Sequence, residues 1–177
     1  EEVKKYVPEK SIFLKRDVRL DGNTVKGKDI YTAFIDEVDA DVYILAHTTS
    51  PFLKVETIQD ALDKVLSGEY DSAFSAKKIQ TFVWYKGKTL NYDLNDVPRT
   101  QDIEPIYYET SSFFIFKKEI FTKYSRRIGF KPYIKEVDNI EGILDEQSGE
   151  IGVFRTKVVV DKVEEGMDDF QISFNDA

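Results

Sequence analysis

One polar segment joins the residue types that could bind or transform an anionic ligand. This segment, His47-Thr48-Thr49-Ser50-Pro51, directly follows an apolar run. Histidine and hydroxyl side chains at such a place can hydrogen-bond a ligand, and His47, the only histidine of the chain, could also act as a base near neutral pH. The alternative is a loop histidine whose ring bonds a backbone carbonyl.

A second polar segment runs from Asn95 to Pro105, and Arg99 and Gln101 lie in it between two prolines. Prolines restrict the backbone, so that neighbouring side chains hold their direction. A guanidinium held in this way could bind a carboxylate or a phosphate through two parallel hydrogen bonds. The alternative is an ion pair of Arg99 with Asp96 or Asp102 at the protein surface.

Apolar periodicity predicts the elements that position the first segment. Residues 42–46 are typical of a buried strand, with an amphipathic helix before them at 29–38 and another after them at 55–65. Residues 70–76 follow as the next strand. This β-α-β order predicts an α/β fold with a three-layer, mostly parallel sheet, in which ligands bind outside the carboxyl ends of the strands.

Shorter signals predict the remaining elements. They are the end of a helix at 1–6, strands at 11–14, 112–116, 132–137 and 158–160, a helix at 118–124, and a hairpin formed by 82–85 and 89–92 around the turn Lys86-Gly87-Lys88. We expect a single domain over residues 1–177, in which 144–177 have the weakest pattern.

Composition excludes several classes of protein. The net charge of −8 disfavours nucleic acid and anionic membranes as partners. The absence of cysteine excludes disulfides, thiolate metal sites and cysteine nucleophiles, and makes a cytoplasmic location the expectation. No apolar run approaches the roughly 20 residues that a membrane-spanning helix needs.

An ordered set of short motifs resembles the acylneuraminate cytidylyltransferases, the CMP-sialic acid synthetases, over about residues 1–142. None of the motifs is specific alone, but their order and spacing are. They are Leu14-Lys15-Arg16, Asp21-Gly22-Asn23, Thr48-Thr49-Ser50-Pro51, Tyr70-Asp71-Ser72-Ala73-Phe74-Ser75, Trp84, Asn91, Pro98-Arg99-Thr100-Gln101-Asp102 and Thr110-Ser111.

The resemblance implies a Rossmann-like nucleotidyltransferase fold and a homodimer that joins CTP to a nonulosonic acid, with Mg²⁺ and with release of pyrophosphate. His47 falls where the family has a sugar-binding glutamine, and Arg99 matches an arginine near the acidic sugar. Thr110 and Ser111 occupy the place of an Asn-Gly pair, and Lys15 matches an arginine beside the nucleotide. These substitutions indicate a sugar preference different from that for sialic acid.

The resemblance also distributes the candidate site residues by role. They are Arg99 and His47 for catalysis, Thr49, Ser50, Gln101, Tyr108, Thr110 and Ser111 for the sugar, Lys15, Arg16, Asp21 and Asn23 for the nucleotide, and Asp145, Asp168 and Asp169 for the metal. The three metal candidates come from two partial matches to the acidic motif of the family, at 144–146 and at 165–170. Both stretches could instead be solvated acidic turns.

One departure from the family concerns the phosphates. The family opens with a strand and a basic, glycine-bearing loop that wraps the CTP phosphates, and this chain begins after that segment. We therefore expect an N-terminally incomplete cytidylyltransferase domain with impaired activity. The alternatives are a non-catalytic sugar-binding or assembly module on the same scaffold, and a transferase for another sugar or polyol phosphate.

Overall fold

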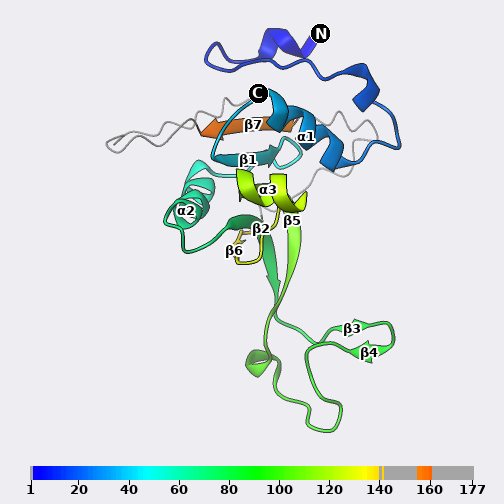
Figure 1. Ribbon diagram of the computed structural model, residues 1–177. Helices are drawn as coiled ribbons and strands as arrows, with labels where there is room; N and C mark the ends of the chain where they lie inside the picture. The colour runs from blue at the N-terminus through cyan, green and yellow to red at the C-terminus, as the bar shows by residue number, and fades with distance from the viewer. Residues whose placement is uncertain (1, 140, 142–154, 161–177) are drawn as a thin grey trace. The chain divides into compact units, whose positions relative to one another are not determined.

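The computed structural model describes residues 2–139, 141 and 155–160 (Figure 1). Its chain divides into two compact units, which are described one at a time. The smaller unit contains the described residues 2–40, and the larger unit contains the described residues of Asp41–Val160. Within the described residues, none of the helices combines the length and the apolar character needed to cross a bilayer.

The smaller unit contains two 3₁₀ helices, Glu2–Tyr6 and Val18–Leu20, followed by the helix α1 (Gly27–Glu37). The Asp29 carboxylate caps α1 by accepting a hydrogen bond from the backbone N–H of Lys26 at 3.1 Å. The strand expected at 11–14 is wrong, because these residues are exposed and form no ladder with another strand.

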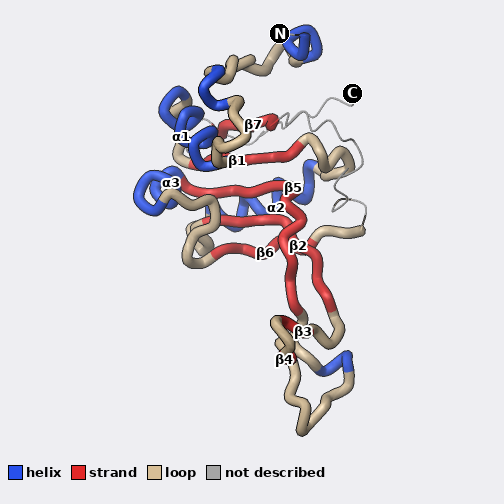
Figure 2. Tube along the Cα trace, turned by 90° about the vertical axis from the view of Figure 1, so that its right-hand side faces the viewer, coloured by secondary structure: helices blue, strands red, loops and turns tan. Residues whose placement is uncertain are grey.

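The larger unit contains a five-stranded sheet in the order β6 (Pro132–Glu136), β2 (Ser72–Ile79), β5 (Ile106–Lys117), β1 (Val42–His47) and β7 (Arg155–Val160) (Figure 2). Among these neighbours only β2 and β6 are parallel, and the other three pairs are antiparallel. The fold is therefore α/β as expected, but the expectation of a mostly parallel sheet is wrong.

The position of β5 explains this difference. β1 and β2 point in the same direction, as expected for strands joined through the helix α2 (Val55–Leu66). After β2, however, the chain leaves the sheet and returns as β5, which lies between β1 and β2 and runs against both. Local periodicity predicts strands and helices, but it carries no information on an insertion of this kind.

Helices cover both faces of this sheet. The positions Ser72, Phe116 and Pro132 share one face, where Phe116 packs its ring against Phe121 of α3 (Lys118–Tyr124). Tyr133 lies on the other face, and its hydroxyl donates a hydrogen bond to Asp60 of α2 at 3.2 Å. The central residues of β5 between these layers are fully buried and form part of the core: Phe113, Phe114 and Ile115.

Beyond the sheet, β2 and β5 continue as a two-stranded ribbon that carries a projecting loop (Figures 1 and 2). We call residues 77–108 the arm. The expected hairpin lies in it and is confirmed in a shorter form, β3 (Trp84–Tyr85) paired with β4 (Lys88–Thr89). Positive φ angles of 49° at Lys86 and 78° at Gly87 give the tight two-residue turn that suits a twisted hairpin.

Most of the other predicted elements are confirmed with shifts of up to three residues at their ends, except that β5 begins six residues before the expected strand. They are the helices expected at 29–38, 55–65 and 118–124, and the strands expected at 42–46, 70–76, 112–116, 132–137 and 158–160.

Candidate functional site

The candidate site lies at one edge of the sheet. Because β1, β2 and β6 point in the same direction, their carboxyl ends meet at this edge, where β5 enters the sheet in the opposite direction. Turns and loops at such an edge expose backbone groups and short polar side chains to a ligand. Three groups of residues meet there: the segment 47–54, the first half of β5, and the segment 136–141.

The segment after β1 forms a turn in which the backbone N–H of Ser50 donates to the carbonyl of His47 at 3.0 Å. His47 and Thr49 are half-buried, and the His47 ring lies 6.1 Å from the ring of Phe114. Ser50 is only 5% exposed, and its hydroxyl finds no hydrogen-bond partner within the part of the chain that the structure describes. A buried hydroxyl without a partner at a strand edge is a candidate ligand contact.

A cluster of buried hydroxyl groups links β2 to β5. Thr110 donates to Ser75 at 2.9 Å, Ser112 donates to Thr110 at 3.2 Å, and Ser75 accepts the backbone N–H of Phe113 at 3.1 Å. All three hydroxyl residues are almost completely buried. Thr110, expected to contact the sugar, is thus engaged inside the protein, where it holds the two strands together.

Ser111 lies at a β-bulge within this cluster. The register between β2 and β5 shifts between Phe74 and Ala76, and Ser111 opposite this shift has a φ of 58°. Glycine adopts this left-handed backbone conformation easily, whereas other residues adopt it at a cost. Such a conformation is one that the glycine implied at this position by the resemblance would adopt easily.

Substitutions at Ser111 test the role of this conformation. We expect Ser111→Val to lower the free energy of unfolding by about 1 to 2 kcal/mol, because a β-branched side chain fits the left-handed region poorly. Ser111→Gly should leave the stability within about 0.5 kcal/mol, because the lower strain offsets the larger entropy of the unfolded chain. Urea unfolding measures both, and Ser111→Ala controls for the lost hydroxyl. A Ser111→Val variant with the same free energy of unfolding as the unaltered protein would contradict this explanation.

Glu141 connects three elements of the site. Its carboxylate accepts hydrogen bonds from the backbone N–H of Lys54 at 3.1 Å and from the Thr57 hydroxyl at 2.5 Å. Its backbone carbonyl accepts a hydrogen bond from Ser112 at 3.2 Å, and its N–H donates to Asp138 at 2.8 Å. The side chain is 5% exposed and caps α2, whose own N-cap residue supplies no capping side chain.

The ammonium of Lys54 lies beside two carboxylates. It is 2.9 Å from Asp138 Oδ2 and 3.7 Å from Glu141 Oε2. The hydrogen bond to Asp138 and then the charge of Glu141 raise the pKa of Lys54 above its usual value. Lysine therefore supplies the positive charge near these acids at neutral pH.

Within the described ranges, no group of three or more acidic or histidine side chains could hold a metal ion. Two acids that follow β6, Asp138 and Glu141, are paired with the Lys54 ammonium instead. The described residues therefore do not fit the Mg²⁺ that the resemblance implies. Asp145, Asp168 and Asp169, the predicted metal ligands, lie outside the described residues.

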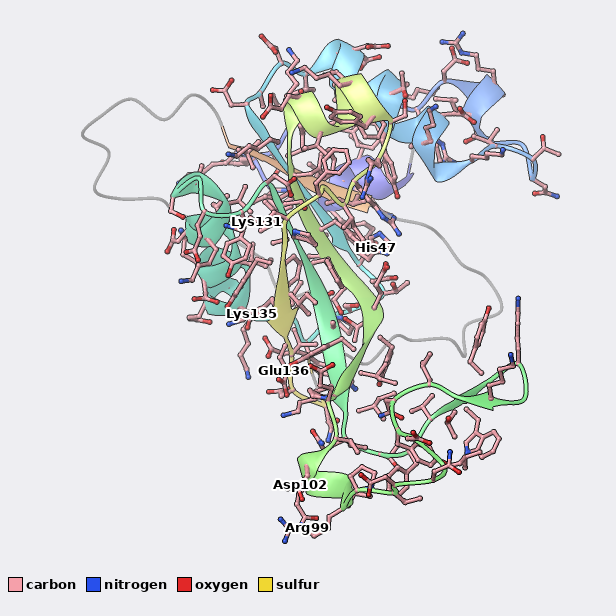
Figure 3. All side chains as sticks on the ribbon, turned by 60° about the horizontal axis from the view of Figure 1, so that its bottom comes forward. His47, Arg99, Asp102, Lys131, Lys135 and Glu136 are labelled. Carbon is pink, nitrogen blue, oxygen red and sulfur yellow. The ribbon has the colours of Figure 1, made fainter. Side chains whose placement is uncertain are left out.

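Arg99 and Gln101 lie on the arm and not at the strand edge. The Arg99 guanidinium forms two hydrogen bonds to the Asp102 carboxylate, at 2.7 and 3.2 Å, and its side chain is 73% exposed. Gln101 is exposed in the adjoining 3₁₀ helix. Figure 3 shows Arg99 and Asp102 at the far end of the arm, well away from His47. Within one chain, Arg99 therefore forms the surface ion pair with Asp102 that was the alternative to ligand binding.

The four residues predicted for the nucleotide belong to the smaller unit. Arg16 donates a hydrogen bond from Nε to Asp21 Oδ1 at 2.6 Å, and Lys15 and Asn23 are exposed. These residues are close in sequence, and the structure brings two of them into an ion pair.

A cavity of about 560 Å³ lies at the base of the arm, beside the segment 136–141. Tyr108, one of the residues predicted for the sugar, contributes to its wall. The complete lining is Lys77, Lys78, Ile79, Gln80, Tyr108, Glu136, Val137, Asp138 and Asn139.

Sequence reasoning missed the residues that hold this edge together. Glu141 lies 87 residues after Lys54 and 84 residues after Thr57, and no local pattern predicts its contact with them. The signal for Ser75 was stronger, because a serine in the middle of a buried strand needs a partner for its hydroxyl.

Comparison with known proteins adds one finding. The family model described as Cytidylyltransferase matches residues 4–164, which is most of the chain. A search of curated proteins gave no match.

Proposed function

Because the chain belongs to the cytidylyltransferase family, a family of nucleotidyltransferases, we propose that it transfers CMP from CTP to a nonulosonic acid related to sialic acid and releases pyrophosphate. The match over residues 4–164 carries the transfer of CMP. The acidic sugar is supported by the ordered motifs, including Thr48-Thr49-Ser50-Pro51 at the strand edge.

In this reaction the anomeric hydroxyl of the sugar attacks the α-phosphorus of CTP. The protein therefore has to hold two anions at a reactive distance more than it has to supply covalent chemistry. We assign Ser50 and Thr49 to hydrogen bonds with the substrates, since the Ser50 hydroxyl is buried at the strand edge without a described partner. His47 on the same turn is assigned to a sugar hydroxyl.

The nucleotide side of the proposal rests on the smaller unit. We assign Lys15, Arg16, Asp21 and Asn23 to CTP, in accordance with the sequence motifs. Mg²⁺, when bound, would offset the phosphate charge. Its proposed ligands are acids outside the described residues, and no step is derived through the ion.

A homodimer is part of the proposal. The arm exposes several large apolar side chains, and exposed apolar surface of this kind is typical of protein interfaces. We propose that the arm packs on a second copy of the chain, so that Arg99 reaches an anion bound by the partner. The exposed large apolar residues of the arm are Trp84, Tyr85, Leu90, Leu94, Val97, Tyr107 and Tyr108.

One observation favours a second candidate, a non-catalytic sugar-binding or assembly module. The acids Asp138 and Glu141 are paired with Lys54, and the described residues form no metal cluster. A module of this type would bind the sugar and leave CTP unchanged.

Enzyme assays separate the two candidates. We expect slow pyrophosphate release, in accordance with the impaired activity expected from the sequence, that requires both CTP and a nonulosonic acid such as sialic acid and that is slower still with other nucleoside triphosphates. Ser50→Ala should lower kcat/KM about tenfold through the loss of one hydrogen bond to substrate. Ser11→Ala in an exposed loop is the control. Sugar binding by calorimetry without pyrophosphate release would overturn the transferase and support the module.

A further inference from the structure

We infer that Gln80 is a positioning residue for Arg99, because its carboxamide fixes the short 3₁₀ helix that directly follows Arg99. This inference rests on the proposed function, in which Arg99 reaches an anion bound by a second copy of the chain. It names the residue that holds Arg99 in place for that contact. All the residues involved belong to the arm, and therefore to the larger unit alone.

The arm has almost no core that could hold its shape. Ile103, which is 6% exposed, is the only buried residue among residues 77–108, all of which the structure describes. The ladder between β2 and β5 ends with the pair of Ile79 and Ile106, and the neighbouring Pro105 has no backbone N–H to donate. The direction of the loop beyond this pair therefore depends largely on hydrogen bonds made by its side chains.

Gln80, the first residue of the chain beyond this ladder, makes two of these hydrogen bonds. Its Nε2 donates to the carbonyl of Thr100 at 2.9 Å and to the carbonyl of Ile103 at 2.8 Å. The two carbonyls lie at the beginning and just after the end of the 3₁₀ helix Thr100–Asp102. Because both partners are acceptors, only the NH₂ group of the carboxamide fits between them, and both of its protons are used. Gln80 therefore fixes the helix at two points.

A second carboxamide holds the other side of the loop. Asn91 Oδ1 accepts the backbone N–H of Val83 at 3.0 Å, and Asn91 Nδ2 donates to the carbonyl of Thr81 at 2.9 Å. These contacts hold the end of the hairpin against the residues that follow β2. Asn91 thus orders the hairpin, whereas Gln80 orders the 3₁₀ helix.

The 3₁₀ helix in turn places Arg99. The Arg99 carbonyl accepts the backbone N–H of Asp102 at 2.9 Å, and the Arg99 guanidinium donates to the Asp102 carboxylate from Nε at 2.7 Å and from Nη2 at 3.2 Å. The two side-chain bonds use one edge of the guanidinium. The end formed by Nη1 and Nη2 keeps three N–H groups with which it can bind a carboxylate. Figure 3 shows Arg99 and Asp102 next to each other at the end of the arm.

The orientation of Arg99 matters more than its charge. Arg99 and Asp102 neutralise each other, so the pair exerts little long-range attraction on an anion. An anion would be recognised through the parallel hydrogen bonds of the guanidinium end, and these bonds require a defined orientation. A 3₁₀ helix that lost its two bonds to Gln80 would no longer maintain this orientation.

Hydrogen exchange followed by NMR tests whether Gln80 holds the helix. In Gln80→Ala the backbone N–H of Asp102, which bonds the Arg99 carbonyl, should exchange about threefold faster. Gln80→Glu should have at least the same effect, because its carboxylate has a similar size but no proton to donate at neutral pH. Asn95→Ala is the control and should leave the exchange unchanged, since Asn95 is an exposed carboxamide of the arm that bonds Asp93 in its own turn. Unchanged exchange in both Gln80 variants would overturn the inference.

A cycle of single and double variants tests whether Gln80 acts through Arg99. Calorimetric titration with sialic acid should give a dissociation constant that rises about fivefold in Gln80→Ala, because the guanidinium loses its orientation. In the Arg99→Ala background the same substitution should change the dissociation constant by less than about twofold, because no guanidinium is left to position. An equal rise in both backgrounds would show that Gln80 acts by another route and would overturn the inference.

The outcomes separate this inference from the proposed function. If pyrophosphate is released from CTP in the presence of sialic acid, but the binding of sialic acid does not depend on Gln80, the transferase stands and the positioning role fails. If the binding depends on Gln80 only while Arg99 is present, and no pyrophosphate forms, the positioning role stands and the transferase fails. A protein that binds no sialic acid would overturn both the positioning role and the acidic sugar of the proposed function.

Discussion

Replacing Glu141 by alanine should lower the free energy of unfolding by about 3 kcal/mol, the largest loss that we expect from removing one side chain at the strand edge. The carboxylate accepts hydrogen bonds from the Lys54 N–H and the Thr57 hydroxyl, and both donors would be left buried or partly buried without it. The helix α2 would also lose its cap, which typically contributes about 1 kcal/mol.

Urea unfolding followed by circular dichroism measures this loss. Glu141→Gln is the matched control, because its carbonyl oxygen can accept the same two hydrogen bonds while the charge beside Lys54 disappears. We expect the glutamine variant to lose about 1 kcal/mol. Alanine and glutamine variants of equal stability would show that the hydrogen bonds to the carboxylate contribute little.

The elements of the sheet could be predicted from the sequence far better than its pairing. The apolar run at 42–46 and the amphipathic pattern at 55–65 have lengths and periods that only a strand and a helix satisfy, and both are confirmed. The insertion of β5 between β1 and β2 depends on where the chain returns after the arm. That return is decided by contacts between residues far apart in sequence, such as the hydroxyl cluster of Ser75 and Thr110.

The candidate site was predictable in its location but not in its partners. The polar segment after β1 does lie at the edge of the sheet where the carboxyl ends of the strands meet, as the run of hydroxyl residues after an apolar strand indicates. Arg99 pairs with Asp102, one of the two surface partners that its neighbourhood in the sequence offered. Glu141 could not be assigned, because an isolated glutamate near a glycine gives no sign that it will cap a helix that starts at residue 55.

A second substitution with a large expected effect lies at the opposite end of the sheet, before β6. Gly129→Ala should lower the free energy of unfolding by about 3 kcal/mol, because a Cβ at this position would overlap the Asp71 carboxylate. That carboxylate accepts the backbone N–H groups of Phe130 at 2.6 Å and Lys131 at 3.1 Å, so its displacement would also break the turn that leads into β6.

The pH dependence identifies Asp71 as the cause of this loss. Burial by itself would raise the pKa of Asp71, but hydrogen bonds from the N–H groups of Phe130 and Lys131 and from the Ser72 hydroxyl outweigh it and lower the pKa below its usual value. A lowered pKa contributes stability above the pKa of the unfolded chain, near 4, and this stability is lost as the pH falls through the folded value. The difference in the free energy of unfolding between the unaltered protein and the Gly129→Ala variant should therefore become smaller when the pH is lowered from neutral to acidic. Gly22→Ala, whose Cβ would meet only Val25 at 3.7 Å, should stay within about 0.5 kcal/mol of the unaltered protein. A gap at Gly129 that is independent of pH would trace the loss to packing alone.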